Sequence, residues 1–509
     1  MTTLVASPAS GQILVAGYLG LLGLLACYGL YRYHLLALYY RYRLTRHPPA
    51  PPPPPASWPT VTIQIPVYNE RYVVERVIRS ACEVDYPHER LEIQVLDDST
   101  DDTSQIIAEA VRPYQRRGMR VVHLRRTDRR HFKTGALTEG LRQALGEFVA
   151  IFDVDFIVPT DFLTRTVPHF ADPSVGMAQA RWGHLNEDYS WLTRAQAMLL
   201  NGHFVIEQVA RQRGGRFFNF NGTAGIWRRA AILSAGGWQA DTLAEDLDLS
   251  FRAHLAGWRG VYLPDLVAYA ELPVEMNAFK HQQYRWTKGS IQTAKKLLPA
   301  ILRSQFPLGR KAELLFHLTM YLSYPLGFLA CAAFPLLLMG LFHVPHSWYM
   351  DAMWCALLVL PGFCFYVCAQ RESDPDWVRH LAGIPWAVMV GIGLSVNNAL
   401  AVLDGLAGRD LTFVRTTKFG IQSKGQRWTQ KRYRARLAPT VWGELALAVY
   451  FGFGCLVALK YDLWLALPSV ALFCASFAYV SGLSLWQGGW LSALRWLQPA
   501  EPRALPEQA

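Results

Sequence analysis

Long apolar segments lie on both sides of a polar middle region, and they constrain the fold more than any other feature of this sequence. They cover 12–40, 313–341, 352–369, 381–403, 441–458 and 463–482. Several are close to the ~20 residues that an α-helix needs to cross a bilayer. The composition agrees, because 51% of the residues are hydrophobic and only 17% are charged. The sequence therefore predicts a globular region at about 60–310 that is bracketed by membrane helices.

The first apolar segment predicts a retained membrane anchor, residues 1–46, rather than a cleaved secretory signal. It has no basic region before it and no obvious small-residue cleavage site, and it is longer than the apolar part of a signal peptide. Four arginines follow its apolar core: Arg32, Arg41, Arg43 and Arg46. The positive-inside rule then places the next domain in the cytoplasm. A Pro-rich stretch, 47–59, predicts a stiff linker between the two.

The net charge of +11 raises the question of nucleic-acid binding. Much of the excess positive charge lies beside apolar segments, as in 423–436, which reads SKGQRWTQKRYRAR. Basic residues in such positions typically contact anionic lipid headgroups. We therefore expect membrane lipids as partners and no nucleic acid.

The start of the polar region predicts a strand, a helix and a second strand. Apolar runs at 60–70 and 91–100 are separated by a helix-like stretch at 71–82. In an α/β unit of this kind, ligands bind at the carboxyl edge of the sheet. We expect one crevice to be lined by Tyr68, Asn69, Glu70, Asp97 and Asp98. The alternative is that the acidic run at 97–102 only caps the following helix.

Two further motifs would bring charge to the same edge. Lys133 stands at the start of a predicted helix, where phosphate can bind, although a cationic surface loop would look similar. A predicted buried strand, 147–159, ends in Asp153 and Asp155. Two carboxylates there need a counter-charge, and a divalent cation held together with diphosphate oxygens supplies it.

The glycine-rich stretch 217–232 predicts a tight loop, which is consistent with close approach of the backbone to a ligand or with an ordinary connection. Glu245 and Asp246 then open an amphipathic helix. Acidic residues in a first turn interact favourably with the helix dipole. A buried carboxylate facing the metal could equally serve as a general base.

A polar and aromatic motif precedes the first internal apolar segment. Gln282, Arg285 and Trp286 are spaced so that they share one face of a helix. One interpretation is an interfacial helix whose Trp and Arg lie among headgroups. The other is that Trp286 is a platform for a sugar ring and Arg285 a partner for phosphate.

Taken in chain order, these motifs resemble the membrane-embedded, processive branch of the inverting family 2 glycosyltransferases, which includes cellulose, hyaluronan and mannan synthases. The shared motifs are PVYNE, LDDSTDDT, KTGAL, FDVDF, QARW, FNGTAG, AEDLD and QQYRW. The resemblance covers about 60–420 and points to the cellulose-synthase-like group. It implies a cytosolic, Rossmann-like GT-A domain of α/β class at 60–275, and interfacial helices at 276–312.

The resemblance also implies roles for individual residues. The nucleotide-sugar ligands would be Tyr68, Glu70, Asp98, Lys133, Asp153, Thr416 and Lys418. Asp153 and Asp155 would hold Mg²⁺ or Mn²⁺, and Asp246 would be the general base beside Glu245. The diphosphate and the acceptor sugar would contact Gln282, Arg285, Trp286, Asn221, Gly222 and Thr223.

Three departures from the family pattern affect these expectations. Ala244 stands where the family usually has Thr, so the hydrogen bonding around the base is open. The segment FVRTTK, 413–418, resembles a gating loop, but Thr417 stands where related sequences usually have Pro, and Arg415 replaces a Val that cellulose synthases tend to have. Both UDP-glucose and GDP-mannose therefore remain candidate donors.

The function that we expect is polymerisation of a hexose into a β-linked polysaccharide that is exported as it grows. The alternative is a lipid glycosyltransferase making a glycosylceramide or a glycosyl-diacylglycerol, since such enzymes share most of the motifs but usually lack the loop and the later helices. A scaffold with an inactive fold is the third hypothesis, against which the intact carboxylates argue.

The rest of the chain predicts about five crossings of a plasma or inner membrane. Helices are expected at 313–403 and 441–485, with the loop and basic segment at 404–440 and a tail at 486–509. An even number of crossings must separate two cytosolic regions. Segment 381–403 is the weakest span, because Asn397 and Asn398 favour an interfacial helix. A split of 313–341 at Pro325 or Pro335 is the less favoured alternative.

Overall fold

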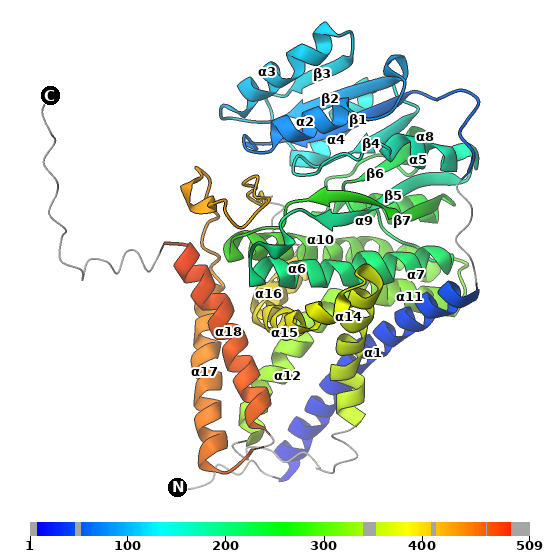
Figure 1. Cartoon of the computed structure of the whole chain (residues 1–509). Coiled ribbons are helices and arrows are strands. Elements are labelled where there is room, and N and C mark those ends of the chain that lie inside the picture. Colours follow the sequence, from blue (N-terminus) through cyan, green and yellow to red (C-terminus); the bar gives the residue numbers. More distant parts are fainter. Residues whose placement is uncertain (1–7, 46–51, 339–352, 409–413, 465, 490–509) are drawn as a thin grey trace, which may run out of the picture.

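The computed structural model describes residues 8–45, 52–338, 353–408, 414–464 and 466–489. An α/β domain lies above a layer of helices that run across the molecule, and steeper helices extend below this layer (Figure 1). Parts of the predicted organisation lie outside the described residues: 1–7 and 46 of the anchor, 47–51 of the linker, 339–352 and 465 of the helical regions, 409–413 of the loop segment and 490–509 of the tail.

A seven-stranded sheet organises the upper domain, with strand order β3-β2-β1-β4-β6-β5-β7. The strands are β1 (Val61–Val67), β2 (Leu91–Asp97), β3 (Arg120–Arg125), β4 (Phe148–Ile151), β5 (Val175–His184), β6 (Gly225–Arg228) and β7 (Arg259–Ala270). The first four strands run parallel, whereas β6 is antiparallel to both β4 and β5. The predicted α/β class is confirmed, although only the first half has the all-parallel pattern of a Rossmann sheet.

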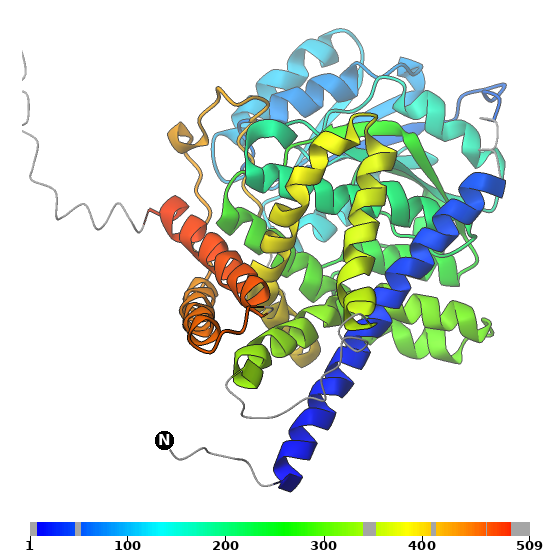
Figure 2. The same ribbon diagram turned by 60° about the horizontal axis from the view of Figure 1, so that its bottom comes forward.

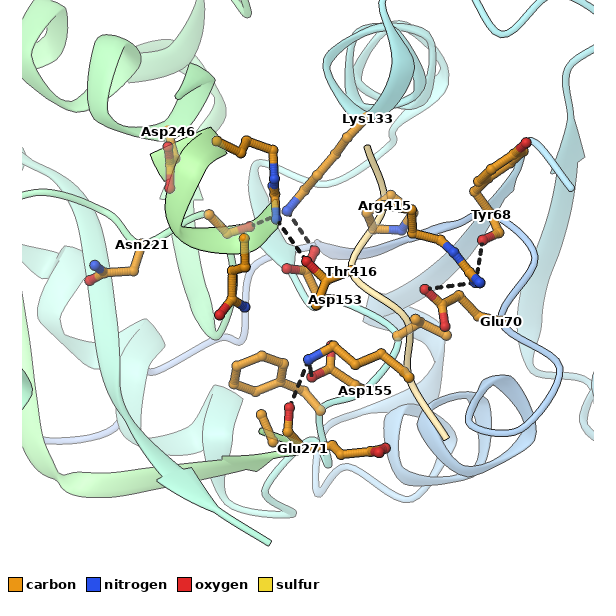
Figure 3. A pocket seen from close by; sticks show the side chains of 18 of the residues that line it. Tyr68, Glu70, Lys133, Asp153, Asp155, Asn221, Asp246, Glu271, Arg415 and Thr416 are labelled. Carbon is orange, nitrogen blue, oxygen red and sulfur yellow. Dashed lines mark hydrogen bonds and ion pairs between the residues drawn. The ribbon is translucent and has the colours of Figure 1, made fainter. Parts of the chain in front are cut away.

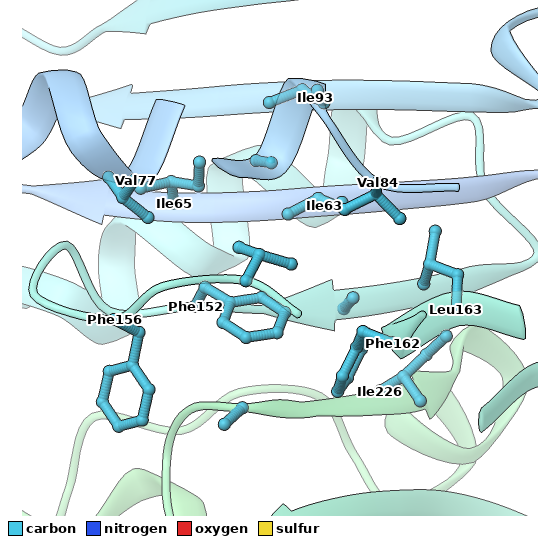
Figure 4. Packing of buried hydrophobic residues seen from close by; sticks show 14 of the residues in the cluster. Ile63, Ile65, Val77, Val84, Ile93, Phe152, Phe156, Phe162, Leu163 and Ile226 are labelled. Carbon is cyan, nitrogen blue, oxygen red and sulfur yellow. The ribbon is translucent and has the colours of Figure 1, made fainter. Parts of the chain in front are cut away.

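The two faces of the parallel half are built differently, which follows from the alternation of side chains along a strand. Apolar residues such as Ile63, Ile65 and Ile93 belong to one buried cluster that also contains Phe152 (Figure 4). On the other face, Gln64 donates to Gln94 at 3.0 Å and Thr62 donates to Glu92 at 2.8 Å. These polar groups are buried but bonded to each other, so the sheet can be covered on both sides.

The helices of the upper domain follow the strands and cover the sheet. They are α2 (Val74–Cys82), α3 (Thr103–Arg116), α4 (Phe132–Gln143), α5 (Phe162–Thr166), α8 (Arg229–Ser234) and α9 (Glu245–Leu255). Short 3₁₀ turns are η1 (His88–Arg90), η2 (Val167–Ala171) and η3 (Glu187–Tyr189). The predicted amphipathic helix that Glu245 and Asp246 open is α9, which begins at Glu245.

A layer of helices separates the sheet from the membrane-type helices (Figure 1). It contains α6 (Trp191–Asn201), a π-helical turn η4 (Gly202–Glu207), α7 (Gln208–Arg213), α10 (Met276–Arg303) and α11 (Leu308–Thr319). Lys280 of α10 forms a 2.5 Å ion pair with Glu444, and both side chains are fully buried. This pair joins the layer to the helices below.

Five helices in the described part of the chain are long and apolar enough to cross a membrane. They are Gln12–Arg43, Leu308–Leu336, Cys355–Ser373, Val441–Lys460 and Leu467–Gln487. The count becomes up to six if a bent pair of helices forms one more span. The second span contains both Pro325 and Pro335 undivided, so the expected alternative of a split there is not seen.

The second span begins with α11 in the layer, and the rest of the spans is formed by helices that gather under the layer (Figures 1 and 2). The elements are α1 (Pro8–Thr45), η5 (Met320–Leu322), α12 (Ser323–Leu338), η6 (Cys355–Val359), α14 (Leu360–Ser373), α17 (Val441–Lys460) and α18 (Leu467–Gln487). The helices α17 and α18 (orange and red) lie side by side at one edge of the group.

The predicted weak span corresponds to the bent pair. It consists of η7 (Trp377–Gly383), α15 (Ile384–Gly393) and α16 (Ser395–Ala407), with a bend of 44°. The break comes just before Asn397 and Asn398, which are buried, and Asn397 donates to the carbonyl of Lys280 at 3.1 Å. The two amides thus face protein, as polar groups at membrane depth are expected to do.

Candidate active site

One cavity at the carboxyl edge of the sheet brings the predicted site residues together (Figure 3). Of the residues to which the resemblance assigns roles, all except Thr223 line it. Tyr68, Glu70 and Asp98 follow β1 and β2, and Asp153 and Asp155 follow β4. Parallel strands present their carboxyl ends at one edge, which is why residues so far apart in sequence meet here.

Two lysines neutralise the aspartates that follow β4. Lys133, from the first turn of α4, donates to Asp153 Oδ1 at 2.5 Å and to the carbonyl of Gly222 at 2.9 Å. Lys418 donates to Asp155 Oδ2 at 2.7 Å and to the carbonyl of Glu271 at 2.7 Å. Burial alone would lower the pKa of Lys133 and of Lys418, but the neighbouring carboxylates raise both. Both ammonium groups therefore stay charged.

Asp246 lies in the same cavity without such a partner among the described residues. Burial, followed by repulsion from Glu245, raises the pKa of the Asp246 carboxyl to about 7. The loop residue Gly222 approaches it so closely that a Cβ there would lie 2.9 Å from Asp246 Oδ2. A carboxylate that titrates near neutral pH can take a proton from a substrate hydroxyl, as a general base does.

Ala244, which replaces the Thr usual in the family, lies in a tightly packed position. It precedes α9 and makes no side-chain capping bond. The backbone of α10 lies against it, because a Cβ on Gly289 would come within 2.7 Å of the Ala244 nitrogen. A small residue at 244 therefore suits this close contact between the two helices.

The far end of the cavity is rich in arginine. The guanidinium of Arg129 lies 3.3 Å from the centre of the Tyr68 ring. Arg415 donates to the carbonyls of Tyr68 and Asn69, and its Nη1 lies 3.3 Å from Glu70 Oε1. Burial raises the pKa of Glu70 to about 8 in spite of Arg415. We did not predict Arg129 as a site residue, although the arginines close to it in the sequence indicate a basic segment.

The segment 415–420 is anchored over the cavity by Glu271, which the sequence analysis also missed. Glu271 is buried and accepts from the backbone N–H groups of Phe419 and Gly420, at 3.0 and 2.7 Å. Gly420 has a φ of 69° and lies against the carbonyl of Tyr72, which suits a residue without a Cβ. The sequence feature that could have identified Glu271 is its position directly after the strand β7.

Asp97 and Asn69 do not line the cavity, contrary to our expectation. Asp97 accepts from the Ser99 nitrogen at 2.8 Å and from Ser104 Oγ at 2.6 Å. The neighbouring Asp98 turns the other way because adjacent side chains at a strand end point to opposite faces. Asp98 is held there by Arg126, at 2.7 and 2.5 Å.

In the acidic run 97–102, one residue, Asp98, lines the cavity and another, Asp101, caps the following helix, so both interpretations apply to different residues. Asp101 Oδ1 accepts from the backbone N–H of Thr103 at the start of α3, at 3.0 Å. Thr223 also has a supporting position, because its Oγ1 accepts from the backbone N–H of Asp153 at 2.8 Å. It therefore fixes the end of β4 and does not face the cavity.

The helix α10 closes the cavity on the side of the membrane-type helices. Gln282, Arg285 and Trp286 all line it, as their spacing predicts. Arg285 Nη2 donates to Thr416 Oγ1 at 3.4 Å. The ring centres of Trp286 and Trp182 are 6.5 Å apart. An aromatic wall of this kind is a suitable platform for a sugar ring.

The donor groups fit a cation that arrives together with its substrate. No cluster of three or more His, Cys, Asp or Glu residues able to hold a metal occurs in the described ranges. Asp153 and Asp155 offer two carboxylates to the cavity. Mg²⁺ is commonly held by one or two carboxylates and completed by substrate phosphates, so two suffice.

The basic segment after the loop lies against the upper domain. Tyr433 donates to Asp101, and the backbone N–H of Arg432 donates to Tyr72 Oη at 2.9 Å. The Lys431 ammonium lies 4.5 Å from the Tyr72 ring centre. Its predicted contact with lipid headgroups stays a prediction.

Residues 59–289 match the family Glycosyltransferase like family 2. These residues form a glycosyltransferase family 2 domain. The chain is similar to glucomannan 4-beta-mannosyltransferases 2 and 7 of Arabidopsis thaliana, with 43% and 42% identity over 255 residues. The match covers 49% of this chain in both cases, and 48% and 46% of the relatives. The chain thus spans about half the length of these curated relatives.

The glycosyltransferase domain also has a structural neighbour. The mannosyltransferase PcManGT from Pyrobaculum calidifontis, solved in complex with GDP-Man and Mn²⁺, matches with a TM-score of 0.52 and 22% identity. The match covers 77% of this chain and 100% of that one. The GT-A-like fold that the motifs predicted is therefore confirmed for this domain.

Proposed function

We propose that this protein is an inverting, processive glycosyltransferase that transfers mannose from GDP-mannose to a growing β-linked polysaccharide. The observation that carries the proposal is the single cavity shared by a neutralised aspartate pair, an aspartate with a pKa of about 7 and the motif of α10. The names of the Arabidopsis relatives favour mannose over glucose. The scaffold hypothesis loses support, because every predicted carboxylate except those that cap loops faces this cavity.

The donor nucleotide would occupy the arginine-rich end. Tyr68 offers an aromatic face and Glu70 a carboxyl group, while Arg129 and Arg415 offer guanidinium groups. The diphosphate would lie near Lys133 and Arg285, which suit its charge. A divalent cation at Asp153 and Asp155, Mg²⁺ or Mn²⁺, would stabilise the charge that develops on the leaving diphosphate.

The transfer itself needs a base and a positioned acceptor. Asp246 would take the proton of the acceptor hydroxyl as its oxygen attacks the anomeric carbon of the donor sugar. The bond from that carbon to the diphosphate breaks on the opposite side, so the configuration inverts and the nucleoside diphosphate leaves with the electron pair. Trp286 and Trp182 would hold the acceptor ring, which lowers the entropic cost of the reaction.

The contacts of the two lysines imply a rearrangement on donor binding. Lys418 now holds Asp155, so its ammonium must withdraw before a cation can bind at that oxygen. The diphosphate is a natural new partner for it. Thr416 lies on the same segment and bonds to Arg285, which would let the segment 414–418 respond to the donor.

The arrangement of the helices supports coupling of synthesis to export. The helix α10 lines the cavity and lies next to helices that can span a membrane (Figure 1). In this proposal the transfer reaction takes place in the domain at 60–275, and the helices at 276–312 bind the growing product. The loop and basic segment at 404–440 close over the bound donor. The helices at 1–46, 313–403 and 441–485 anchor the enzyme in the membrane. The arginines in the second half of α1, Arg32, Arg41 and Arg43, favour a cytoplasmic face of a plasma or inner membrane, with lipids as partners.

The proposal is tested with the full chain in nanodiscs. Radiolabelled GDP-mannose and UDP-glucose are supplied separately with Mn²⁺ or Mg²⁺, and ethanol-insoluble label is counted. We expect polymer from GDP-mannose, sensitive to a β-mannanase, and little from UDP-glucose. Label that moves into the organic phase would replace this proposal with a lipid glycosyltransferase.

A further inference from the structure

A π-helical turn interrupts the helix that runs under the cavity. The turn η4 joins α6 to α7 and contains His203 and Glu207. Such turns are rare and often occur at functional sites. Here His203 Nδ1 lies 3.1 Å from Glu207 Oε2, and His203 Nε2 lies 2.9 Å from Asn221 Nδ2. His203 is therefore bonded on both sides, and one of its partners is a residue of the cavity wall.

The direction of each hydrogen bond follows from the neighbours. Gln208 Nε2 lies 2.8 Å from the carbonyl of Asn219 and 2.7 Å from Asn221 Oδ1, so it donates to both. Asn221 thus turns its oxygen to Gln208 and its NH₂ group to His203. His203 Nε2 must then accept, and its proton is on Nδ1, from which it donates to Glu207.

A buried arginine completes the chain of contacts. Arg211 Nη1 donates to Glu207 Oε2 at 3.1 Å, and Arg211 Nη2 donates to Tyr31 Oη of α1 at 3.2 Å. Its Nε is also 3.8 Å from Glu313 of α11. Burial would raise the pKa of Glu207, but Arg211 and His203 outweigh it and hold this pKa well below its usual range. Glu207 is therefore an anion that keeps accepting from His203.

The cavity end of this chain lies beside Asp246. Asn221 precedes Gly222, whose backbone approaches Asp246 Oδ2. Figure 3 shows Asn221 and Asp246 on one side of Asp153, and Tyr68 and Glu70 on the other. The NH₂ group of Asn221 has two hydrogens, and only one is used by His203. The second can be offered to a hydroxyl in the cavity.

We propose that His203, oriented by Glu207, is a positioning residue that directs the amide of Asn221 toward the acceptor sugar next to Asp246. This inference rests on the proposed function, because it assigns a role at the acceptor end of the same cavity. His203 itself does not touch the reacting atoms. It acts by fixing which way the Asn221 amide faces.

Two substitutions separate this role from a purely structural one. His203→Gln places an amide oxygen near the position of Nε2, so it can still accept from Asn221. His203→Asn places an amide nitrogen near the position of Nδ1, so it can still donate to Glu207 but does not reach Asn221. A structural role that works through Glu207 would favour Asn, whereas positioning of Asn221 favours Gln.

The readout is the KM for an added manno-oligosaccharide acceptor, with the Kd of GDP measured on the same samples. We expect His203→Asn to raise the acceptor KM about tenfold, as the loss of one oriented hydrogen bond does. We expect His203→Gln to stay within about threefold of wild type, and the GDP Kd to be unchanged in both. His169→Asn, in η2 and away from the cavity, is the matched control and should change neither quantity.

A double-substitution cycle with Asn221→Ala supplies the second test. If His203 acts only through Asn221, His203→Asn adds no further rise in acceptor KM once Asn221 is Ala. Additive effects, an unchanged acceptor KM in His203→Asn, or a defect in His203→Gln that equals the one in His203→Asn would each overturn the inference. Failure of the proposed function is distinguishable, because the wild-type protein would then add no mannose to the manno-oligosaccharide acceptor.

Discussion

The two ends of the cavity use the same residue types in different ways. At the donor end, four acidic side chains have a cationic partner: Asp98 with Arg126, Asp153 with Lys133, Asp155 with Lys418 and Glu70 with Arg415. At the acceptor end, Asp246 has no ion pair within the described residues, and burial raises its pKa to about 7.

The comparison teaches how one fold can bind charge and move protons in a small space. A paired aspartate can exchange its lysine for a divalent cation, and the released lysine can then contact the diphosphate. An unpaired, buried aspartate can hold and release a proton near neutral pH. Glu70 shows that burial can exceed the effect of one arginine, because its pKa is about 8.

Asp246→Asn should have the largest effect, because it removes the proton acceptor and nearly preserves shape. We expect the transfer rate to fall about a thousandfold. GDP binding in the presence of Mn²⁺ should stay within about twofold of wild type, since Asp246 is at the other end of the cavity. Comparable losses in transfer and in GDP binding would mean that the two ends are not separate.

Asp155→Asn should instead weaken binding of the donor nucleotide. It removes a cation ligand and leaves Lys418 without its carboxylate, so we expect the affinity for GDP in saturating Mn²⁺ to fall about thirtyfold. Calorimetric titration with and without Mn²⁺ measures this. Asp161→Asn, an aspartate at the start of α5 and outside the cavity, is the control and should bind GDP normally.

Arg415→Ala should have a moderate effect confined to the donor. It removes the contacts to the carbonyls of Tyr68 and Asn69 and to Glu70, so we expect the KM for GDP-mannose to rise about tenfold with an unchanged acceptor KM. Arg434→Ala, in the basic segment that follows the loop and stacked on Trp428, should leave both constants unchanged. A rise in the acceptor KM alone would contradict the assignment of Arg415 to the donor end of the cavity.

Glu245→Gln should have the smallest effect and the most specific one. The charge of Glu245 helps to raise the pKa of Asp246, so its removal lowers that pKa. Because the base must be deprotonated, the rise of kcat with pH should move to lower pH in the variant. Parallel pH profiles of the two proteins measure the shift, and a shift to higher pH would contradict the assignment.

The sequence predicted the parts of the site that lie at strand ends and helix starts. Asp153, Asp155 and Asp246 each stand where an element begins or ends, and the spacing of Gln282, Arg285 and Trp286 places them on one helical face. Periodicity and topology suffice there, because the geometry is local or follows from the parallel sheet.

The residues that the sequence did not predict act through tertiary contacts between segments that are distant in the chain. Glu271 holds the segment after Arg415, and His203 orients Asn221 across a helix, so neither pairing has a spacing that periodicity can detect. The opposite orientations of Asp97 and Asp98 depend on where β2 ends to within one residue. Boundaries at that precision are the least predictable feature of a sequence.

The pH dependence of kcat tests the central claim most directly. With saturating GDP-mannose, Mn²⁺ and acceptor, the account predicts that kcat rises about tenfold per pH unit below pH 7 and levels off above it, because Asp246 must lose its proton. A kcat that is constant from about pH 5 to pH 8 would contradict the division of the cavity into a charge-binding end and a proton-accepting end.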